Sequence, residues 1–589
     1  QAQEGRLFSP LAYTKTYAMA AAAGLAVTLV PVLLGYCVRG RIRPEGKNPI
    51  NRLLTSLYHR LLRTLLRFPK TLVGLALVVM VLGLWPAQRL GTEFMPPLDE
   101  GDLMYMPTTY AGVSIGEARQ ILQQTDKLIK TLPEVNTVFG KVGRAETATD
   151  PAPLTMIETV IQFKPREQWR PGLSKADLRA ELENLIDFPG LNNAWVMPIR
   201  TRIDMLATGI KTPVGIKIAG PDLTVIQSLG QALEAILGEL PGTLSAYAER
   251  VSGGRYLKVD IDRQSAARYG LNIADVQAVV RTAIGGAQVT ETIEGQERYP
   301  VNLRYPQHYR DSPEAMRNLP IVTPKGEHIA LGSVARIFVE DGPPMIKSEN
   351  ARLNGWLYVD IAGQDLGSYV QEAQARVASE LDLPPGYALH WTGQYEHMQR
   401  AKERLLLVLP LTLSLIVLLL YLNFRRFAEV AMILATLPFG LLGGVWLLLA
   451  LGYDLSVAVV MGFIALAGVA VEIGVLMLVY LNLEYRALQA DFQARGKTIT
   501  REDLRQAVTR GAGLRLRPIV MTAATLFAGL LPIMLGGGPG SEVMQRIAAP
   551  MVGGVFSTLL LTLLVLPAVY FLWYGRASEL AVASCREHS

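Results

Sequence analysis

The sequence predicts a polytopic α-helical membrane protein of about seven spans, with one large α+β domain outside the membrane. Half of the 589 residues are hydrophobic and only 18% are charged, which is too apolar for a soluble chain of this length. The apolar residues gather into runs of about 20, the length at which a helix crosses a bilayer. Residues 91–404 contain no such run and alternate between strand-like and helical patterns.

Two of the predicted spans precede the large domain and five follow it. They cover residues 17–38, 71–90, 405–424, 427–451, 455–483, 518–535 and 547–573. The chain therefore divides into a span at 1–38, a cytoplasmic amphipathic linker at 39–70, a span at 71–90, the large domain, a five-span bundle at 405–575 and a cytoplasmic tail at 576–589.

Basic residues assign the two sides of the membrane. The connection at 39–70 holds nine Lys and Arg residues and one acid, Glu45, so it is predicted to be cytoplasmic. If the spans alternate, the large domain lies outside the cytoplasm. Residues 51–67 place Leu at three- and four-residue steps with Arg between them. This pattern predicts an amphipathic helix that either lies on the inner leaflet or packs on the span ends.

The large domain repeats strand–helix–strand units, which predict ferredoxin-like subdomains. These subdomains are expected at 91–252 and 347–404, with a further subdomain inserted at 253–346. The strands are expected at 102–110, 134–142, 156–163, 214–218, 243–249 and 353–361, and the helices at 114–131, 175–186, 223–240 and 367–381.

Several kinds of chemistry have no motif in the sequence. Cys37 and Cys585 are far apart and the six His residues show no HxxxH or HExxH spacing, so neither disulfides nor a zinc cage are predicted. No phosphate loop, nucleophile elbow or catalytic carboxylate pair is recognisable, so neither an enzyme nor a bound cofactor is expected. The net charge of +6 is expected beside the spans, which favours the membrane surface over nucleic acid.

Two residue types could carry chemistry. Glu472 lies in the apolar run 455–483, where an ionisable group costs at least about 2.5 kcal/mol and normally faces a bundle interior with a partner. It is predicted to carry protons or to be a structural carboxyl, with Thr522 and Thr525 on the next span as possible partners. Methionine thioethers, of which the chain has 18, favour Cu(I) or Ag(I) over Zn(II), but composition alone singles out no subset.

Six stretches spread over the chain match a known family pattern. They are GRLFSPLAYTKTYAMA from Gly5, GDLMYMP from Gly101, KVGRAETATDPAPLTMIET from Lys141, RTRIDMLATGIKTPVGIKI from Arg200, GFIALAGVAVEIGV from Gly462 and GSEVMQRIAAPMVGG from Gly540. Together they resemble the heavy-metal branch of the resistance-nodulation-division (RND) efflux pumps, specifically its copper and silver members of the CusA and SilA type.

The resemblance implies a homotrimer in the bacterial inner membrane, whose periplasmic domain combines porter subdomains with a docking subdomain. It also implies a periplasmic membrane-fusion adaptor and an outer-membrane channel as partners, and export of Cu(I) or Ag(I) in exchange for protons. Such pumps have two homologous halves. The chain resembles the last span of the first half followed by the second half, so it is expected to be a C-terminal fragment that lacks the N-terminal half.

The resemblance also implies a metal site outside the membrane. The family's periplasmic site is a cluster of three methionines with a glutamate nearby. These positions fall here on Met106, Met156, Met205 and Glu158.

A path for metal and protons through the membrane is implied as well. Met19 and Met544 match positions in the family's methionine pairs, and Glu472 matches its intramembrane carboxylate. Two positions depart from the pattern, because Leu34 replaces a methionine and Ile519 replaces a lysine. One step of the methionine path is therefore expected to differ from that of the family. For the proton relay, either Arg515 or Arg517 takes the place of the lysine, or the coupling itself differs.

Three other functions compete with this one. A divalent-cation RND pump for zinc, cobalt or nickel would use carboxylate or imidazole ligands. A multidrug exporter would line its pocket with aromatic residues, which make up only 7% of this chain. A non-transporting membrane-anchored module would need neither site.

Overall fold

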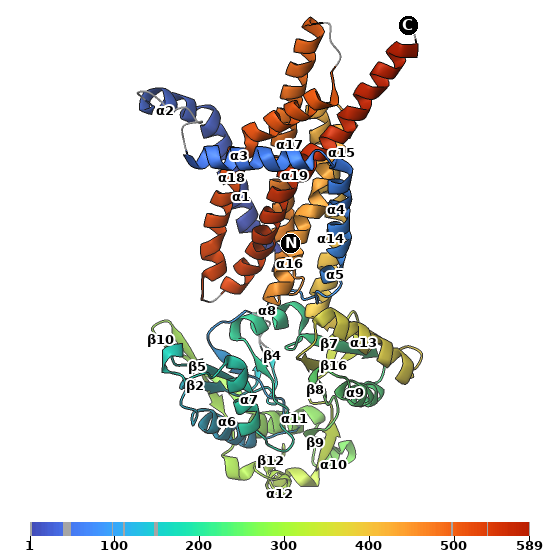
Figure 1. The fold of residues 1–589 in the computed structure, drawn as a ribbon. Helices are drawn as coiled ribbons and strands as arrows, with labels where there is room; N and C mark the ends of the chain where they lie inside the picture. The colour runs from blue at the N-terminus through green and yellow to red at the C-terminus, as the bar shows by residue number, and fades with distance from the viewer. Residues whose placement is uncertain are drawn as a thin grey trace.

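The computed structural model describes residues 3–38, 49–96, 98–109, 112–146, 151–495, 499–538 and 540–587. A bundle of long helices forms one part of the molecule, and a domain of strands and shorter helices lies at one end of it (Figure 1). The C-terminal end of the last helix and the amphipathic helix α3 (Pro49–Leu65) lie toward the opposite end of the bundle. This arrangement agrees with the two sides that the basic residues predict.

Within the described residues, six helices are long and apolar enough to cross a membrane. A seventh is obtained if α1 (Gln3–Val27) and α2 (Leu29–Cys37), which are bent by 48°, form one span. All seven predicted runs fall on these helices. The six are Pro69–Ala87 (α4 and α5), α14 (Gln394–Phe424), Phe427–Leu451 (α15 and α16), α17 (Val457–Ala494), α18 (Arg501–Leu535) and α19 (Ser541–Glu587), of which Ser541–Gly575 is the candidate span.

The amphipathic helix α3 packs against the ends of the spans. Tyr58, Leu62 and Leu66 are buried, and the Tyr58 hydroxyl donates a hydrogen bond of 2.7 Å to the Leu563 carbonyl. Leu57, on the outer side, is 62% exposed. Packing on the span ends is thus observed, and the exposed Leu side also suits a lipid surface.

The first sheet of the large domain has the antiparallel order β2-β5-β1-β6. Its core joins Tyr105, Ile161 and the buried sides of two helices. The strands are β1 (Leu103–Tyr105), β2 (Val135–Lys141), β5 (Glu158–Phe163) and β6 (Trp195–Val196), and the helices are α6 (Ile115–Ile129) and α7 (Lys175–Leu185).

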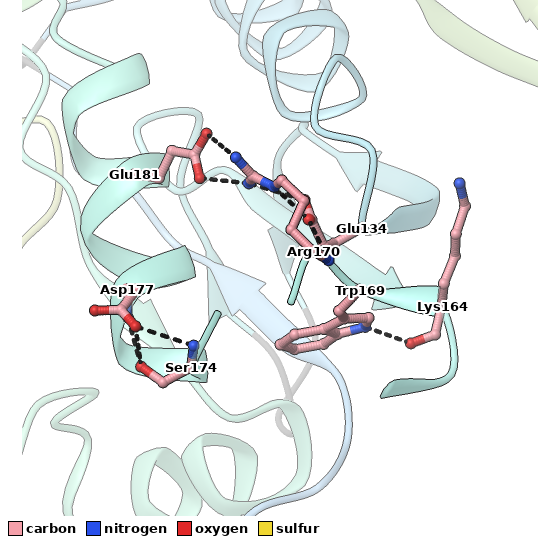
Figure 2. Close-up of polar contacts among 7 residues, drawn as sticks. All are labelled: Glu134, Lys164, Trp169, Arg170, Ser174, Asp177 and Glu181. Atoms are coloured by element: carbon pink, nitrogen blue, oxygen red, sulfur yellow. Dashed lines mark hydrogen bonds and ion pairs between the residues drawn. The ribbon is translucent and has the colours of Figure 1, made fainter. Parts of the chain in front are cut away.

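An ionic cluster fixes the loop that leads into α7. Figure 2 shows Arg170 between two carboxylates, with Nε 2.6 Å from Glu134 Oε1 and Nη2 2.6 Å from Glu181 Oε2. The hydrogen bonds from Arg170 hold the pKa of the buried Glu134 carboxyl below its usual value. Ser174 and Asp177 then form the capping box that begins α7.

The second sheet has the order β15-β16-β7-β17, and β8 also pairs with β16. Leu233, Leu237 and Val370 of two helices pack on Ile216 and Leu357 of its strands. The strands are β7 (Val214–Gly220), β8 (Thr243–Ala248), β15 (Lys347–Glu349), β16 (Arg352–Ile361) and β17 (Ala388–Gly393), and the helices are α9 (Leu223–Gly238) and α13 (Leu366–Glu380).

The segment between the two parts of the second sheet has a core of its own, which includes Val276, Leu319 and Leu331. It leaves and rejoins the sheet through one antiparallel pair, β9 with β14, in which Gly254 faces Gly342. Its elements are β9 (Gly254–Ile261), α10 (Arg263–Arg268), α11 (Ile273–Val279), the hairpin β10 (Ala287–Glu294) and β11 (Glu297–Leu303), α12 (Pro313–Arg317), β12 (Pro320–Val322), β13 (His328–Ala330) and β14 (Ala335–Gly342).

Candidate metal site

A cavity of about 420 Å³ opens in the large domain, and its walls come from strands of the second sheet and from segments that flank the strands of the first sheet. Thioether, ammonium and carboxylate side chains all reach it. The lining residues used below are Thr108, Met156, Arg202, Met205, Gly209, Lys211, Glu249, Met345, Lys347, Trp356 and Tyr358.

Two of the three predicted methionines line this cavity. Met156 lies just before β5 and forms an isolated antiparallel bridge with Thr108. Met205 lies on α8 (Pro198–Thr208), which begins with a proline and ends at Gly209 in the left-handed conformation with φ 82°. The Gly209 amide donates to the Met205 carbonyl at 2.8 Å, so the position of Met205 is fixed by the end of its helix.

The third predicted methionine, Met106, is not among the residues that line the cavity, although the next residues, Pro107 and Thr108, are. Its side chain is fully buried and its amide donates to the Ala194 carbonyl at 2.8 Å. The strand expected over 102–110 is shorter than predicted, because β1 ends at Tyr105 and Pro107 cannot donate to a ladder. Thr108 pairs only through isolated bridges.

Glu158 is placed near the cavity but is already engaged by two cations. Its carboxylate is 2.8 Å from Lys141 Nζ and 3.6 Å from Arg202 Nη2, and the residue is 5% exposed. Arg202 lines the cavity, whereas Glu158 does not. The Glu158 carboxylate therefore affects the charge of the cavity through its ion pair with Arg202 rather than as a metal ligand.

The polar groups of the cavity are largely paired with one another. Lys211 Nζ donates to the Met106 carbonyl at 2.9 Å and to the Thr108 hydroxyl at 2.7 Å. Burial lowers the pKa of Lys211 to about 8. Glu249 accepts hydrogen bonds from Lys347 at 2.5 Å and from the Tyr358 hydroxyl at 2.7 Å. Lys211, Lys347 and Glu249 are thus engaged with neighbouring groups, whereas thioether sulfur is a neutral ligand type that soft cations prefer.

The predicted proton carrier does not face the interior of this bundle. Glu472 is exposed on α17, and no hydrogen bond or ion pair joins it to another residue that the structure describes. The buried side of α17 carries Ala470, Ile473 and Met477 instead. Thr522 is also exposed, and its hydroxyl donates to the Pro518 carbonyl at 3.1 Å, so the expected contact between Thr522 and Glu472 is not formed.

The remaining relay positions lie on four different helices, α1, α2, α18 and α19. Met19 on α1 and Met544 on α19 are 62% and 39% exposed, and Leu34 on α2 is exposed as well. Ile519 is buried in the core of the bundle. The lysine of the family pattern is thus replaced by a core residue.

Sequence reasoning missed one buried carboxylate in the bundle. Glu429 on α15 (Phe427–Leu434) is 4% exposed and accepts from the Tyr574 hydroxyl at 2.9 Å and from Asn482 Nδ2 at 3.1 Å. The feature of the sequence that could have indicated Glu429 is an acidic residue in the first turn of an apolar helix. Its full set of partners indicates a structural role.

The described residues include no group of three or more His, Cys, Asp or Glu side chains that could hold a metal ion.

A family model described as the AcrB/AcrD/AcrF family matches residues 1–574. The chain belongs to this family. The resemblance to RND transporters of the CusA and SilA type is confirmed as well.

Two curated members and one solved structure of this transporter group illustrate the similarity. The cation efflux system protein CusA of Escherichia coli strain K12 is 52% identical over 98% of this chain and 55% of its own length. The putative cation efflux system protein SilA of Salmonella typhimurium is 50% identical over 99% of this chain and 55% of its own length. A crystal structure of a heavy metal efflux pump matches with a TM-score of 0.81 and 31% identity, over 96% of this chain and 55% of the other.

The chain thus spans about half the length of the relatives it matches. The expectation that it corresponds to their C-terminal half is not borne out by these matches.

Proposed function

We propose that this chain acts in an RND pump that uses the proton gradient to export Cu(I) or Ag(I), and that the cavity of Met156 and Met205 binds the metal as substrate. The observation that carries this proposal is the meeting of these two thioethers, from separate segments of the chain, in one cavity outside the helical bundle. The resemblance to the copper and silver branch supports the same substrate.

The chemistry of the cavity favours a soft monovalent ion over a divalent one. Neutral sulfur binds Cu(I) and Ag(I) well and adds no negative charge. A zinc, cobalt or nickel site would draw on carboxylates or imidazoles, whereas Glu158 and Glu249 are each already bound to Lys or Arg side chains.

The proposed setting is a homotrimer in the bacterial inner membrane with the large domain in the periplasm. A membrane-fusion adaptor and an outer-membrane channel would complete the export path. Alternating access would couple the cavity to Glu472 as the proton carrier, with Met19 and Met544 on the metal path. In the described chain these residues are exposed on their helices, which leaves them accessible to further helices.

The substrate site is tested with Met205→Leu, which keeps the volume of the side chain and removes its sulfur. We expect the purified chain in detergent to bind Ag(I) about 10- to 100-fold more weakly by isothermal titration. Met316→Leu is the matched control, because Met316 is buried in the core of the inserted segment. Unchanged Ag(I) affinity in both Met156→Leu and Met205→Leu would reject the site.

A further inference from the structure

A third thioether reaches the cavity from a part of the chain that no sequence motif singled out. Met345 is partly buried and lines the same cavity as Met156 and Met205. The three come from three different segments. Met156 precedes β5 of the first sheet, Met205 lies on the helix that links the two sheets, and Met345 precedes β15 of the second sheet.

The backbone on the N-terminal side of Met345 is held firmly. Pro343 and Pro344 restrict this segment to an extended conformation. The Tyr256 hydroxyl donates to the Pro343 carbonyl. Pro344 packs so closely on Gly254 that a Cβ added there would lie 2.8 Å from the Pro344 Cα.

On the C-terminal side, Lys347 begins β15 and pairs with Asn354 of β16, and its side chain is held as well. Lys347 Nζ is 2.5 Å from Glu249 and 3.7 Å from the centre of the Trp356 ring. Met345 is therefore presented to the cavity between two fixed points, while its own unbranched side chain can still adjust. A flexible side chain on a fixed backbone suits a ligand that must close on an ion.

We propose that Met345 is a further metal ligand of the cavity, which donates its thioether to a soft monovalent cation together with Met156 and Met205. This inference rests on the proposed function. Each neutral sulfur replaces part of the hydration of the ion without adding charge, so a third thioether strengthens binding of Ag(I) or Cu(I) selectively. Because Met156 precedes a strand of the first sheet and Met345 precedes a strand of the second, the bound ion would also connect these two parts of the domain.

The test is Met345→Leu in the full chain in detergent, with Ag(I) as the probe. We expect Ag(I) affinity to fall about 10-fold or more by titration. X-ray absorption at the silver edge should count one sulfur neighbour fewer than in the unmodified chain. Met316→Leu should change neither quantity. Circular dichroism checks folding, and Met345→Ile replaces the Leu variant if that variant unfolds.

The outcomes separate this inference from the function on which it rests. If Met205→Leu weakens Ag(I) binding while Met345→Leu changes neither the affinity nor the sulfur count, the role of Met345 is overturned and the substrate site stands. If neither Met156→Leu nor Met205→Leu affects Ag(I) binding, the proposed function itself fails.

Discussion

Glu472 is a carboxylate placed halfway along an apolar helix without a partner among the described residues. An ionisable residue at that depth in an apolar helix is a candidate for a functional role. We expect Glu472→Gln, which imitates the permanently protonated form, to abolish uptake of Ag(I) into proteoliposomes driven by a pH gradient. Binding of Ag(I) should persist, because the cavity lies in the other part of the molecule.

Glu484→Gln is the matched control for this variant, since Glu484 lies on the same helix beyond the apolar run and 3.9 Å from Arg510. It should transport normally. Normal transport by Glu472→Gln would remove Glu472 from the proton path.

Some residues of the cavity and of the bundle could be predicted from the sequence, and others could not. Motifs around Met156 and Met205 predicted two residues that the cavity brings together. Met345 could not be predicted, because its place in the cavity depends on how an inserted segment returns to the second sheet. Glu429 was missed because an acid at the end of an apolar run looks like a boundary, whereas its partners come from two other helices.

At the scale of elements, the C-terminal end of α8 forms part of the cavity wall, because Gly209 both ends this helix and lines the cavity. Gly209 has φ 82°, and a Cβ added to it would lie 2.5 Å from Cη2 of Trp356. We expect Gly209→Ala to destabilise the domain by about 1–3 kcal/mol, because both the left-handed backbone and the contact with the ring disfavour a side chain. The measurement is thermal unfolding followed by circular dichroism.

Gly238→Ala provides the comparison for this substitution. Gly238 ends α9, is exposed, and has open space where a Cβ would lie. It should be neutral or slightly stabilising. Equal stability of the two variants would show that the close packing of α8 on Trp356 is unimportant.

The apolar runs predicted where the spans lie but not how far their helices extend. The helix α17 continues to Ala494 and α18 begins at Arg501, well beyond the runs 455–483 and 518–535. Polar interactions support these extensions, including the capping box of Thr500 with Asp503 and the ion pair of 2.9 Å between Arg495 and Asp491. Hydropathy does not register such interactions, so it underestimates the helices.

For the whole molecule, the cavity matters because segments from distant parts of the chain must fold together to form it. Residues from Pro107 to Tyr358 contribute to its walls. An ion held there binds only the folded domain, so it should stabilise that domain as a unit. We expect Ag(I) at about 100 times its dissociation constant to add about 2.7 kcal/mol to the free energy of unfolding. The unfolding temperature should rise accordingly, and a chelator should reverse the rise.

Zn(II) at the same concentration should leave the unfolding temperature nearly unchanged, because the open ligands of the cavity are thioethers and the nearby carboxylates are paired. Met205→Leu should reduce the shift caused by Ag(I) without changing the metal-free unfolding temperature by much. An equal rise with Zn(II) and Ag(I) would show that the carboxylates exchange their Lys and Arg partners for metal. The cavity would then serve divalent cations, and the preference for soft ions would be wrong.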